Sequence, residues 1–90
     1  MKKYYFIKKH YEATESNENF AGEVKDFYCG KGMTSCSEFF KYFNYYIKNN
    51  AYTRLCDAKR AYKAHLELAN SEMKYGFWKV SVEIVEFEVA

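Results

Sequence analysis

The chain has 90 residues, of which 49% are hydrophobic and 21% aromatic, and it carries 14 basic against 12 acidic side chains. A chain this short buries only about 60% of the surface that its unfolded form exposes, so we expect residues 1–90 to form one domain with one core. The formal net charge of +2 does not by itself indicate a polyanionic partner, and no apolar run reaches the roughly 20 residues of a membrane helix. The sequence therefore predicts a small cytoplasmic protein with no membrane partner.

The first third of the chain predicts a β-hairpin that ends in a glycine turn. Residues 3–11 are rich in aromatic and β-branched side chains, which favours a strand, and residues 13–22 have the small and polar composition of a loop. Residues 23–29 resume the strand pattern, and Gly30 and Gly32 allow the backbone to turn. The stretch FYCGKGMTSC, residues 27–36, lacks the G-x-x-x-x-G-K-[ST] spacing of a phosphate-binding loop, so we interpret it as a turn that exposes Lys31.

Two helices are predicted between residues 35 and 70. Ser35 or Ser37 precedes Glu38 in the manner of an N-cap, and apolar residues follow at helical spacing, although the aromatic content of residues 37–49 would also suit a strand. Thr53 is placed to cap the second helix, which has good helix formers and no breaker up to residue 70. The second helix is expected to bury one stripe, made of Leu55, Ala58, Ala61, Tyr62, His65, Leu68 and Ala69.

The last strand is predicted over residues 77–89, where apolar and polar side chains alternate. The alternation slips at Ile84 and Val85, which indicates either a bulge or a strand end that is apolar on both faces. If this strand pairs antiparallel with the first, the amino-terminal lysines lie near the glutamates at positions 86 and 88. We therefore predict an α+β fold of ββααβ order, with a three-stranded antiparallel sheet in the order 2-1-3 and two helices packed on one face.

Cysteine and histidine spacing gives no sign of a metal or catalytic site. Cys29 and Cys36 are separated by six residues and the other candidate ligands are scattered, whereas zinc sites use close Cys or His pairs. Cys56 is expected in or near the core, and His65 is expected at the core's edge with its hydrogen-bonding groups satisfied. An odd cysteine count predicts free thiols in a reducing compartment. We predict no catalytic residue, no metal and no cofactor, and hence a protein that is not an enzyme.

One feature of the first predicted helix points to binding. If Phe39, Phe43, Tyr46 and Ile47 face inward, five other residues form an outward stripe at helical spacing: Lys41, Tyr42, Tyr45, Lys48 and Asn49. Interleaved tyrosines and lysines bind a protein through aromatic anchors, or a nucleic acid through stacking and phosphate contacts. The plain alternative is a solvated helix face with no partner.

A secondary basic surface, made of Lys31, Lys59, Arg60 and Lys63, favours the nucleic-acid alternative. Arg54, near the start of the second predicted helix, would extend this basic area. The acidic last strand and the small net charge argue against nucleic-acid binding, because neutralisation of phosphates dominates the affinity of proteins for nucleic acids. A third alternative is a homodimer that forms through an exposed edge strand. We place recognition of a protein partner first and nucleic acid second.

Three segments, FYCGKGMT, AYTRLCDAKRAYK and GFWKVSVEIVEFEV, resemble a loose group of small phage and mobile-element proteins. These share an opening strand, a second strand that ends in an aromatic residue and a glycine turn, a helix with an A-K-R-A segment, and a closing strand. Some small phage proteins of this general build act against host defence systems, including anti-CRISPR inhibitors. The resemblance implies an accessory protein that binds and inhibits a host protein in the host cytoplasm, and it assigns a role to no residue.

Overall fold

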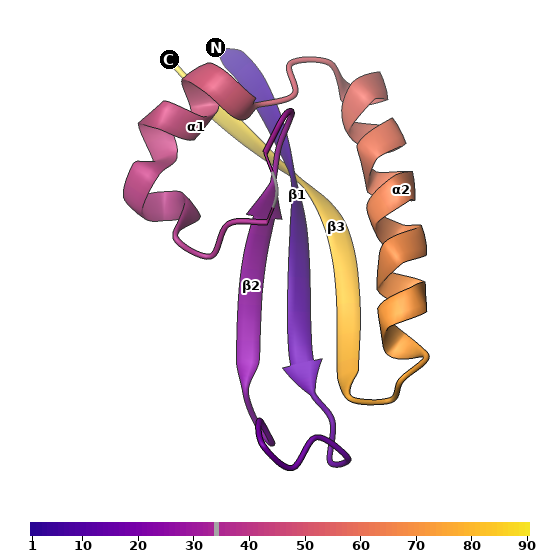
Figure 1. The fold of residues 1–90 in the computed structure, drawn as a ribbon. Helices are drawn as coiled ribbons and strands as arrows, with labels where there is room; N and C mark the ends of the chain where they lie inside the picture. The colour runs from indigo at the N-terminus through magenta and orange to yellow at the C-terminus, as the bar shows by residue number, and fades with distance from the viewer. Residues whose placement is uncertain (34) are drawn as a thin grey trace.

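The chain forms a three-stranded antiparallel sheet flanked by helices, in a computed structural model that describes residues 1–33 and 35–90 (Figure 1). In chain order the elements are β1 (Lys2–Ala13), β2 (Val24–Cys29), the 3-10 helix η1 (Phe39–Tyr42), α1 (Phe43–Asn50), α2 (Leu55–Met73) and β3 (Trp78–Val89). The sheet has the order β2-β1-β3, so the predicted α+β class, ββααβ order and strand order are confirmed. Residues 39–50 are helical, which excludes the strand alternative for this part of the chain.

β1 and β3 pair over twelve residues in one unbroken register. Ile84 and Val85 each lie opposite a residue of β1, so β3 has no bulge there. The predicted bulge is therefore wrong. The other alternative holds only in part, because Val85, Phe87 and Val89 lie on one face and Ile84 lies on the other face with Glu86 and Glu88, so the apolar side of β3 changes face along the strand. The expected attraction between the two ends of the chain is present at one pair, because Lys3 Nζ lies 4.0 Å from Glu86 Oε1.

The two helical segments lie on opposite faces of the sheet, which corrects the prediction that both pack on one face. On one face, Phe6 of β1 packs against Phe39 of η1, with ring centroids 4.7 Å apart. On the other face, Nζ of Lys9 in β1 lies 3.6 Å from Oε1 of Glu72 in α2. Side chains alternate between the two faces along an unbroken strand, so residues 6 and 9 point to opposite sides.

The chain crosses from one face to the other past the end of β2. β2 has six residues against twelve in β1, so Tyr5 has no partner in β2. The segment between α1 and α2 takes that place: the Tyr5 N–H donates to the Tyr52 carbonyl at 2.8 Å, and the Tyr52 N–H donates back at 3.0 Å. Covers on both faces are needed because Tyr5, Phe6 and Ile7 form an uninterrupted buried run, which a sheet with one solvated face does not accommodate.

The first helical segment begins without the predicted serine cap. The backbone groups of Cys36 pair with those of Tyr28 on the outer edge of β2, at 3.0 Å in both directions. Ser35 and Ser37 flank this bridge, so the chain around them follows the sheet edge and they do not cap a helix. η1 then starts at Phe39, and no side chain caps it.

The second helical segment begins after Arg54, so the prediction that Thr53 caps it is wrong. No side chain caps this end of α2, and the helix extends to Met73, beyond the predicted end. The expectation that Cys56 lies in or near the core is also wrong, because its position in the first turn of α2 is exposed.

Only part of the predicted stripe on α2 is buried. Ala58 and Ala69 are fully buried, whereas Leu55 and Leu68 are exposed; the other three members, at positions 61, 62 and 65, are half-buried. Because alanine side chains are small, Ala58 and Ala69 let the axis of α2 approach the sheet closely. The buried part of α2 is therefore a narrow strip along the helix. Successive residues turn by about 100° around a helix, which carries Leu68 away from the line of Ala69 to the flank of α2.

The glycine turn after β2 is confirmed. A backbone hydrogen bond of 3.3 Å closes it onto the Gly30 carbonyl, and Gly32 has φ of 70°, a conformation that favours glycine. Gly30 is required for a different reason, since a Cβ there would collide with the Asn50 carbonyl and the Phe6 ring. Thr34, which the prediction placed in the same stretch, lies outside the described residues.

Candidate binding surface

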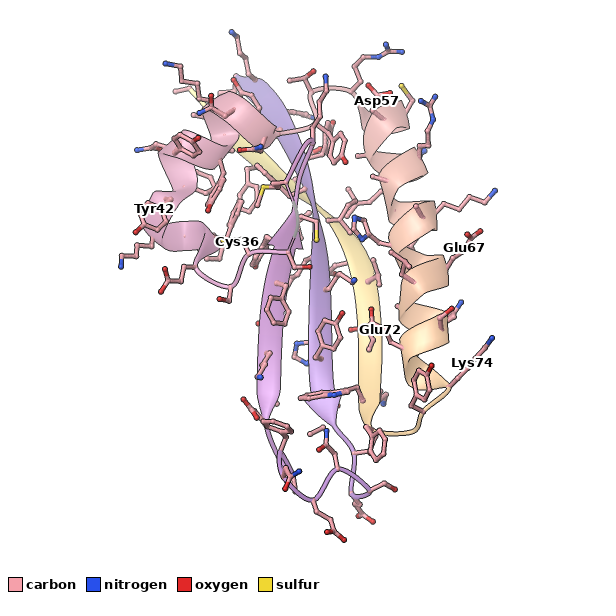
Figure 2. All side chains as sticks on the ribbon, viewed as in Figure 1. Cys36, Tyr42, Asp57, Glu67, Glu72 and Lys74 are labelled. Atoms are coloured by element: carbon pink, nitrogen blue, oxygen red, sulfur yellow. The ribbon has the colours of Figure 1, made fainter. Side chains whose placement is uncertain are left out.

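An exposed set of aromatic and basic side chains covers the outer side of η1 and α1. We call it the aromatic–lysine surface and define it as Phe40, Lys41, Tyr42, Tyr45, Lys48 and Asn49. All five residues of the predicted stripe are exposed, and the three aromatic side chains are 62% (Phe40), 48% (Tyr42) and 63% (Tyr45) accessible. Figure 2 shows Tyr42 pointing away from the sheet.

The opposite side of the same segment is anchored in the core, as the sequence predicted. Phe39 is buried and stacks on Tyr28 with centroids 4.5 Å apart, and Phe43 packs edge-on against Phe87 at 5.0 Å. The Tyr46 hydroxyl lies 3.3 Å from Cys36 Sγ, which ties α1 to the edge of the sheet. These inward residues recur at helical spacing, so the positions between them must face outward.

The predicted stripe omitted Phe40, which is among the most exposed aromatic side chains of the surface. Phe40 contacts Tyr28 edge-on at 5.3 Å while most of its ring stays accessible. Its sequence neighbour Phe39 occupies the core, and adjacent helical residues point about 100° apart, so both rings cannot be buried under one contact. The adjacency of Phe39 and Phe40 in the sequence therefore indicated that one of the two rings is exposed.

The cations of the aromatic–lysine surface are available to a partner. Among the described residues, neither Lys41 nor Lys48 has an ion-pair partner. The Lys41 ammonium lies 5.6 Å from the centroid of the Tyr42 ring, which keeps charge and aromatic face together. Asn49 already uses one of its hydrogen-bonding groups within the helix, because its side-chain amide donates to the Tyr45 carbonyl at 2.8 Å.

The predicted secondary basic surface is divided between two sides of α2. Lys31 and Arg60 line one pocket, between the glycine turn and the helix. Lys59 and Lys63 are one helical turn apart on the other flank and do not line it. Arg54 is oriented toward Asp57, with Nε 3.9 Å from Oδ2. The structure therefore brings Lys31 and Arg60 together at the pocket and places Lys59 and Lys63 together on the other flank of α2.

A polar cluster that the sequence did not reveal lies under α2. Lys9 has only 6% of its side chain exposed and pairs with Glu72, whose side chain is 41% exposed. In Figure 2, Glu72 is directed from α2 over the sheet, whereas Glu67 points away from it. Burial, and next the Glu72 carboxylate, raise the pKa of Tyr11, so its hydroxyl stays protonated at neutral pH.

His65 completes this cluster and differs in part from its prediction. It is half-buried, as expected for the edge of the core, but its Nδ1 is buried and lacks a hydrogen-bond partner among the described residues. Burial, and next the charge of Lys9, lower the pKa of His65, so its ring is neutral at pH 7. A neutral imidazole beside a buried ammonium avoids repulsion between two cations.

The described cysteines are all free thiols, as predicted. Cys29 is buried, and burial raises the pKa of its thiol, while its Sγ lies 3.6 Å from Ser35 Oγ. The thiol form is a weak nucleophile compared with the thiolate. Among residues 1–33 and 35–90, no group of three or more His, Cys, Asp and Glu side chains could hold a metal ion.

The half of the sheet face that η1 and α1 leave open is polar and internally paired. His10 Nδ1 lies 2.6 Å from Asp26 Oδ1 and its Nε2 lies 3.2 Å from Glu12 Oε1. On the same face, Lys8 Nζ lies 3.8 Å from Glu83 Oε1. This part of the sheet therefore presents satisfied charges and has the character of a solvated face.

Comparison of the chain with protein families, with known proteins and with solved structures found no match in any of the three. Among the helices of the described residues, none combines the length and the apolar composition needed to cross a bilayer.

Proposed function

We propose that this protein is a non-catalytic binding protein that attaches to a protein partner through its aromatic–lysine surface. The observation that supports this function is the group of three large aromatic side chains, Phe40, Tyr42 and Tyr45, exposed together on one short segment. Tyrosine and other aromatic residues are enriched in the buried centres of protein interfaces and dominate their binding energy. Large apolar groups gathered on a small domain are otherwise a liability for solubility.

The anchoring of η1 and α1 supports this proposal over a solvated face. Phe39, Phe43 and Tyr46 hold the segment against the sheet, so the exposed rings are carried on a fixed backbone. The backbone that carries the exposed rings therefore does not have to be ordered on binding, which favours affinity. A purely solvated face would gain nothing from three exposed aromatic rings.

We further propose that the partner is a host protein, such as a component of a defence system, which the chain binds and inhibits in the host cytoplasm. This step rests on the resemblance of the segments around the glycine turn, α2 and β3 to small phage and mobile-element proteins. Nucleic acid is the less favoured partner, because Lys59 and Lys63 lie apart from Lys41 and Lys48 on a different element. Strong phosphate binding needs several cations on one continuous track.

The test is capture of a partner from a bacterial host lysate, with and without nuclease, followed by titration of the purified partner. Changing Tyr42 and Tyr45 together to alanine is expected to weaken binding by about 30-fold or more, as for loss of two interface anchors. The matched control changes Tyr75 and Phe77 to alanine, because these are also exposed aromatic residues but belong to the turn before β3. The control variant should bind as the wild type does.

Three outcomes would contradict the proposal. Undiminished binding by the Tyr42 and Tyr45 variant would show that the surface is wrong. Equal loss in the control variant would indicate non-specific hydrophobic attachment. Capture that disappears with nuclease and weakens steeply with salt would transfer the function to nucleic acid. Far-UV circular dichroism of each variant shows whether the fold is intact.

A further inference from the structure

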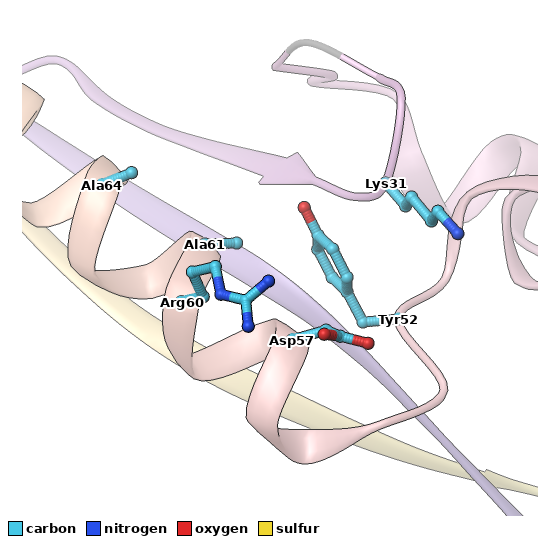
Figure 3. A pocket seen from close by; sticks show the side chains of 6 residues that line it. All are labelled: Lys31, Tyr52, Asp57, Arg60, Ala61 and Ala64. Carbon is cyan, nitrogen blue, oxygen red and sulfur yellow. The ribbon is translucent and has the colours of Figure 1, made fainter.

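Two pockets adjoin at Tyr52, beside the aromatic–lysine surface. The first has a volume of about 420 Å³ and lies between the glycine turn and α2, lined by Lys31, Tyr52, Asp57, Arg60, Ala61 and Ala64 (Figure 3). The second, of about 470 Å³, shares Lys31, Tyr52 and Asp57 with the first and continues to Lys48 and Asn49 of α1. Four of these residues belong to α2, and the small side chains of Ala61 and Ala64 leave room beside Asp57 and Arg60.

The backbone around Tyr52 is fixed by hydrogen bonds on both sides. Tyr52 exchanges two backbone hydrogen bonds with Tyr5, as described above, and these hold it in the plane of the sheet. The Lys31 N–H donates to the Asn50 carbonyl at 2.6 Å, and the Asn50 side-chain amide donates to the Lys31 carbonyl at 3.0 Å. In Figure 3 the Tyr52 ring stands between the turn that carries Lys31 and the first turns of α2. The pockets are therefore preformed.

Positive charge predominates around the two pockets. Three cations line them, Lys31, Lys48 and Arg60, against one carboxylate, Asp57, which gives a net charge of +2. Asp57 is oriented toward Arg54, and within the described residues none of the three cations has an ion-pair partner. Concave surfaces with one sign of charge concentrate the field and attract groups of the opposite sign. The pockets therefore complement an anionic group on an aromatic or aliphatic stem.

We infer that the two pockets form one site for the carboxylate side chains of an acidic segment in the protein partner. This inference rests on the proposed function, because Lys48 and Asn49 belong both to the second pocket and to the aromatic–lysine surface. The guanidinium of Arg60 matches a carboxylate in a two-point arrangement, and the Tyr52 ring and the alanine wall accommodate a glutamate stem. An acidic segment bound here lies beside a partner surface that is docked on the exposed tyrosines.

A nucleic acid suits the same pockets less well. Phosphates repeat along a strand and favour a long cationic track, whereas here only three cations surround two adjoining hollows that share Tyr52. Carboxylates on alternate residues of an extended peptide can enter the hollows separately.

The test uses a fluorescein-labelled peptide that alternates glutamate and alanine over about eight residues, enough to span both pockets at roughly 3.3 Å per residue. Binding is followed by fluorescence anisotropy at low and at physiological salt. The test variant changes Lys31 and Arg60 to glutamate, and the matched control changes Lys59 and Lys63 to glutamate. Both variants change the net charge by the same amount, but only the first alters residues that line a pocket.

The wild-type protein is expected to bind the acidic peptide, and the Lys31 and Arg60 variant to lose about tenfold or more in affinity. The control variant should retain affinity within about twofold. An equal loss of peptide affinity in both variants would mean that binding depends only on the net charge of the protein, and this would overturn the inference. No binding at about 1 mM, the weak end of the affinity scale, would also overturn it.

A single-stranded DNA oligonucleotide of the same formal charge is titrated in parallel. DNA binding tighter than peptide binding would overturn the inference in favour of phosphate recognition. The readouts of this test and of the proposed function are separate. A failed peptide titration beside an intact, Tyr42-dependent capture removes only this inference, whereas capture without Tyr42 dependence removes the proposed function and leaves the peptide result standing.

Discussion

The buried ion pair between Lys9 and Glu72 makes an asymmetric prediction about stability. The Lys9 side chain is 6% exposed, whereas that of Glu72 is 41% exposed. Changing Glu72 to glutamine therefore leaves an ammonium buried beneath α2 without its counter-charge. Changing Lys9 to methionine removes the buried charge and leaves Glu72, which has water on one side. The first change should destabilise the fold, and the second should have little effect or stabilise it.

The size of the difference follows from these exposures. Removing one partner of a fully buried pair costs about 3–5 kcal/mol, while an exposed pair contributes about 0–1 kcal/mol. Because Glu72 is partly solvated, we expect Glu72→Gln to cost about 2 kcal/mol and Lys9→Met to change stability by less than about 1 kcal/mol. Methionine is close to lysine in shape and fills the same space with apolar atoms.

Urea unfolding followed by circular dichroism at pH 7 measures both variants. A domain of this size has a urea dependence near 1 kcal/mol per molar, so Glu72→Gln should lower the midpoint by about 2 M. Lys9→Met should leave the midpoint within about 1 M of wild type. If Lys9→Met is the more destabilising change, the ammonium contributes favourable interactions and the reasoning about burial is wrong.

Three further predictions test other parts of the fold. Gly30→Ala should destabilise the protein by about 1–3 kcal/mol in the same urea assay, because its Cβ would collide with surrounding atoms; a neutral result would contradict the close packing at the turn. Hydrogen bonding to Asp26 is the main cause that raises the pKa of His10 above 6.5, so this pair stabilises the fold fully below pH 6.5 and the stabilisation is lost as pH rises through the raised pKa. Asp26→Asn should therefore lower the melting temperature more at about pH 5 than at about pH 9, and equal losses at both would refute this. Cys56 is exposed while Cys29 is buried with a raised pKa, so mass spectrometry after brief maleimide treatment should find Cys56 labelled about tenfold faster or more; faster labelling of Cys29 would contradict the structure.

Strand pairing was predictable from the sequence because local patterns specify it. The alternation after residue 77 identifies β3, and the opposite charges of Lys3 and Glu86 agree with its antiparallel pairing to β1. The placement of the helices was not deduced, although a signal was present. Tyr5, Phe6 and Ile7 are consecutive apolar residues in β1, and a strand without alternation requires cover on both faces.

The aromatic–lysine surface was predictable for a similar reason, since it depends on the spacing of residues within one short segment. The proposed site for an acidic segment has no such local pattern. Its residues Lys31, Tyr52 and Arg60 come from the glycine turn, the segment between α1 and α2, and α2 itself. The cluster of Lys9, Glu72 and His65 likewise joins β1 to α2. Sites assembled from distant segments require the fold before the residues can be grouped.

The short length of β2 connects the fold to the proposed binding sites. β2 stops opposite Ile7, which leaves the backbone of Tyr5 unpaired on that side, and an unpaired buried backbone is costly. The backbone of Tyr52 supplies the missing hydrogen bonds to the backbone of Tyr5. The segment that contains Tyr52 also carries the chain from α1 to the other face of the sheet, where α2 begins. The Tyr52 ring is then left between the glycine turn and α2, where it lines both pockets. Because backbone groups make this crossing, the exposed cations that line the pockets, Lys31, Lys48 and Arg60, do not hold the crossing in place. Recognition of a partner through these three side chains can therefore change independently of the sheet that supports them.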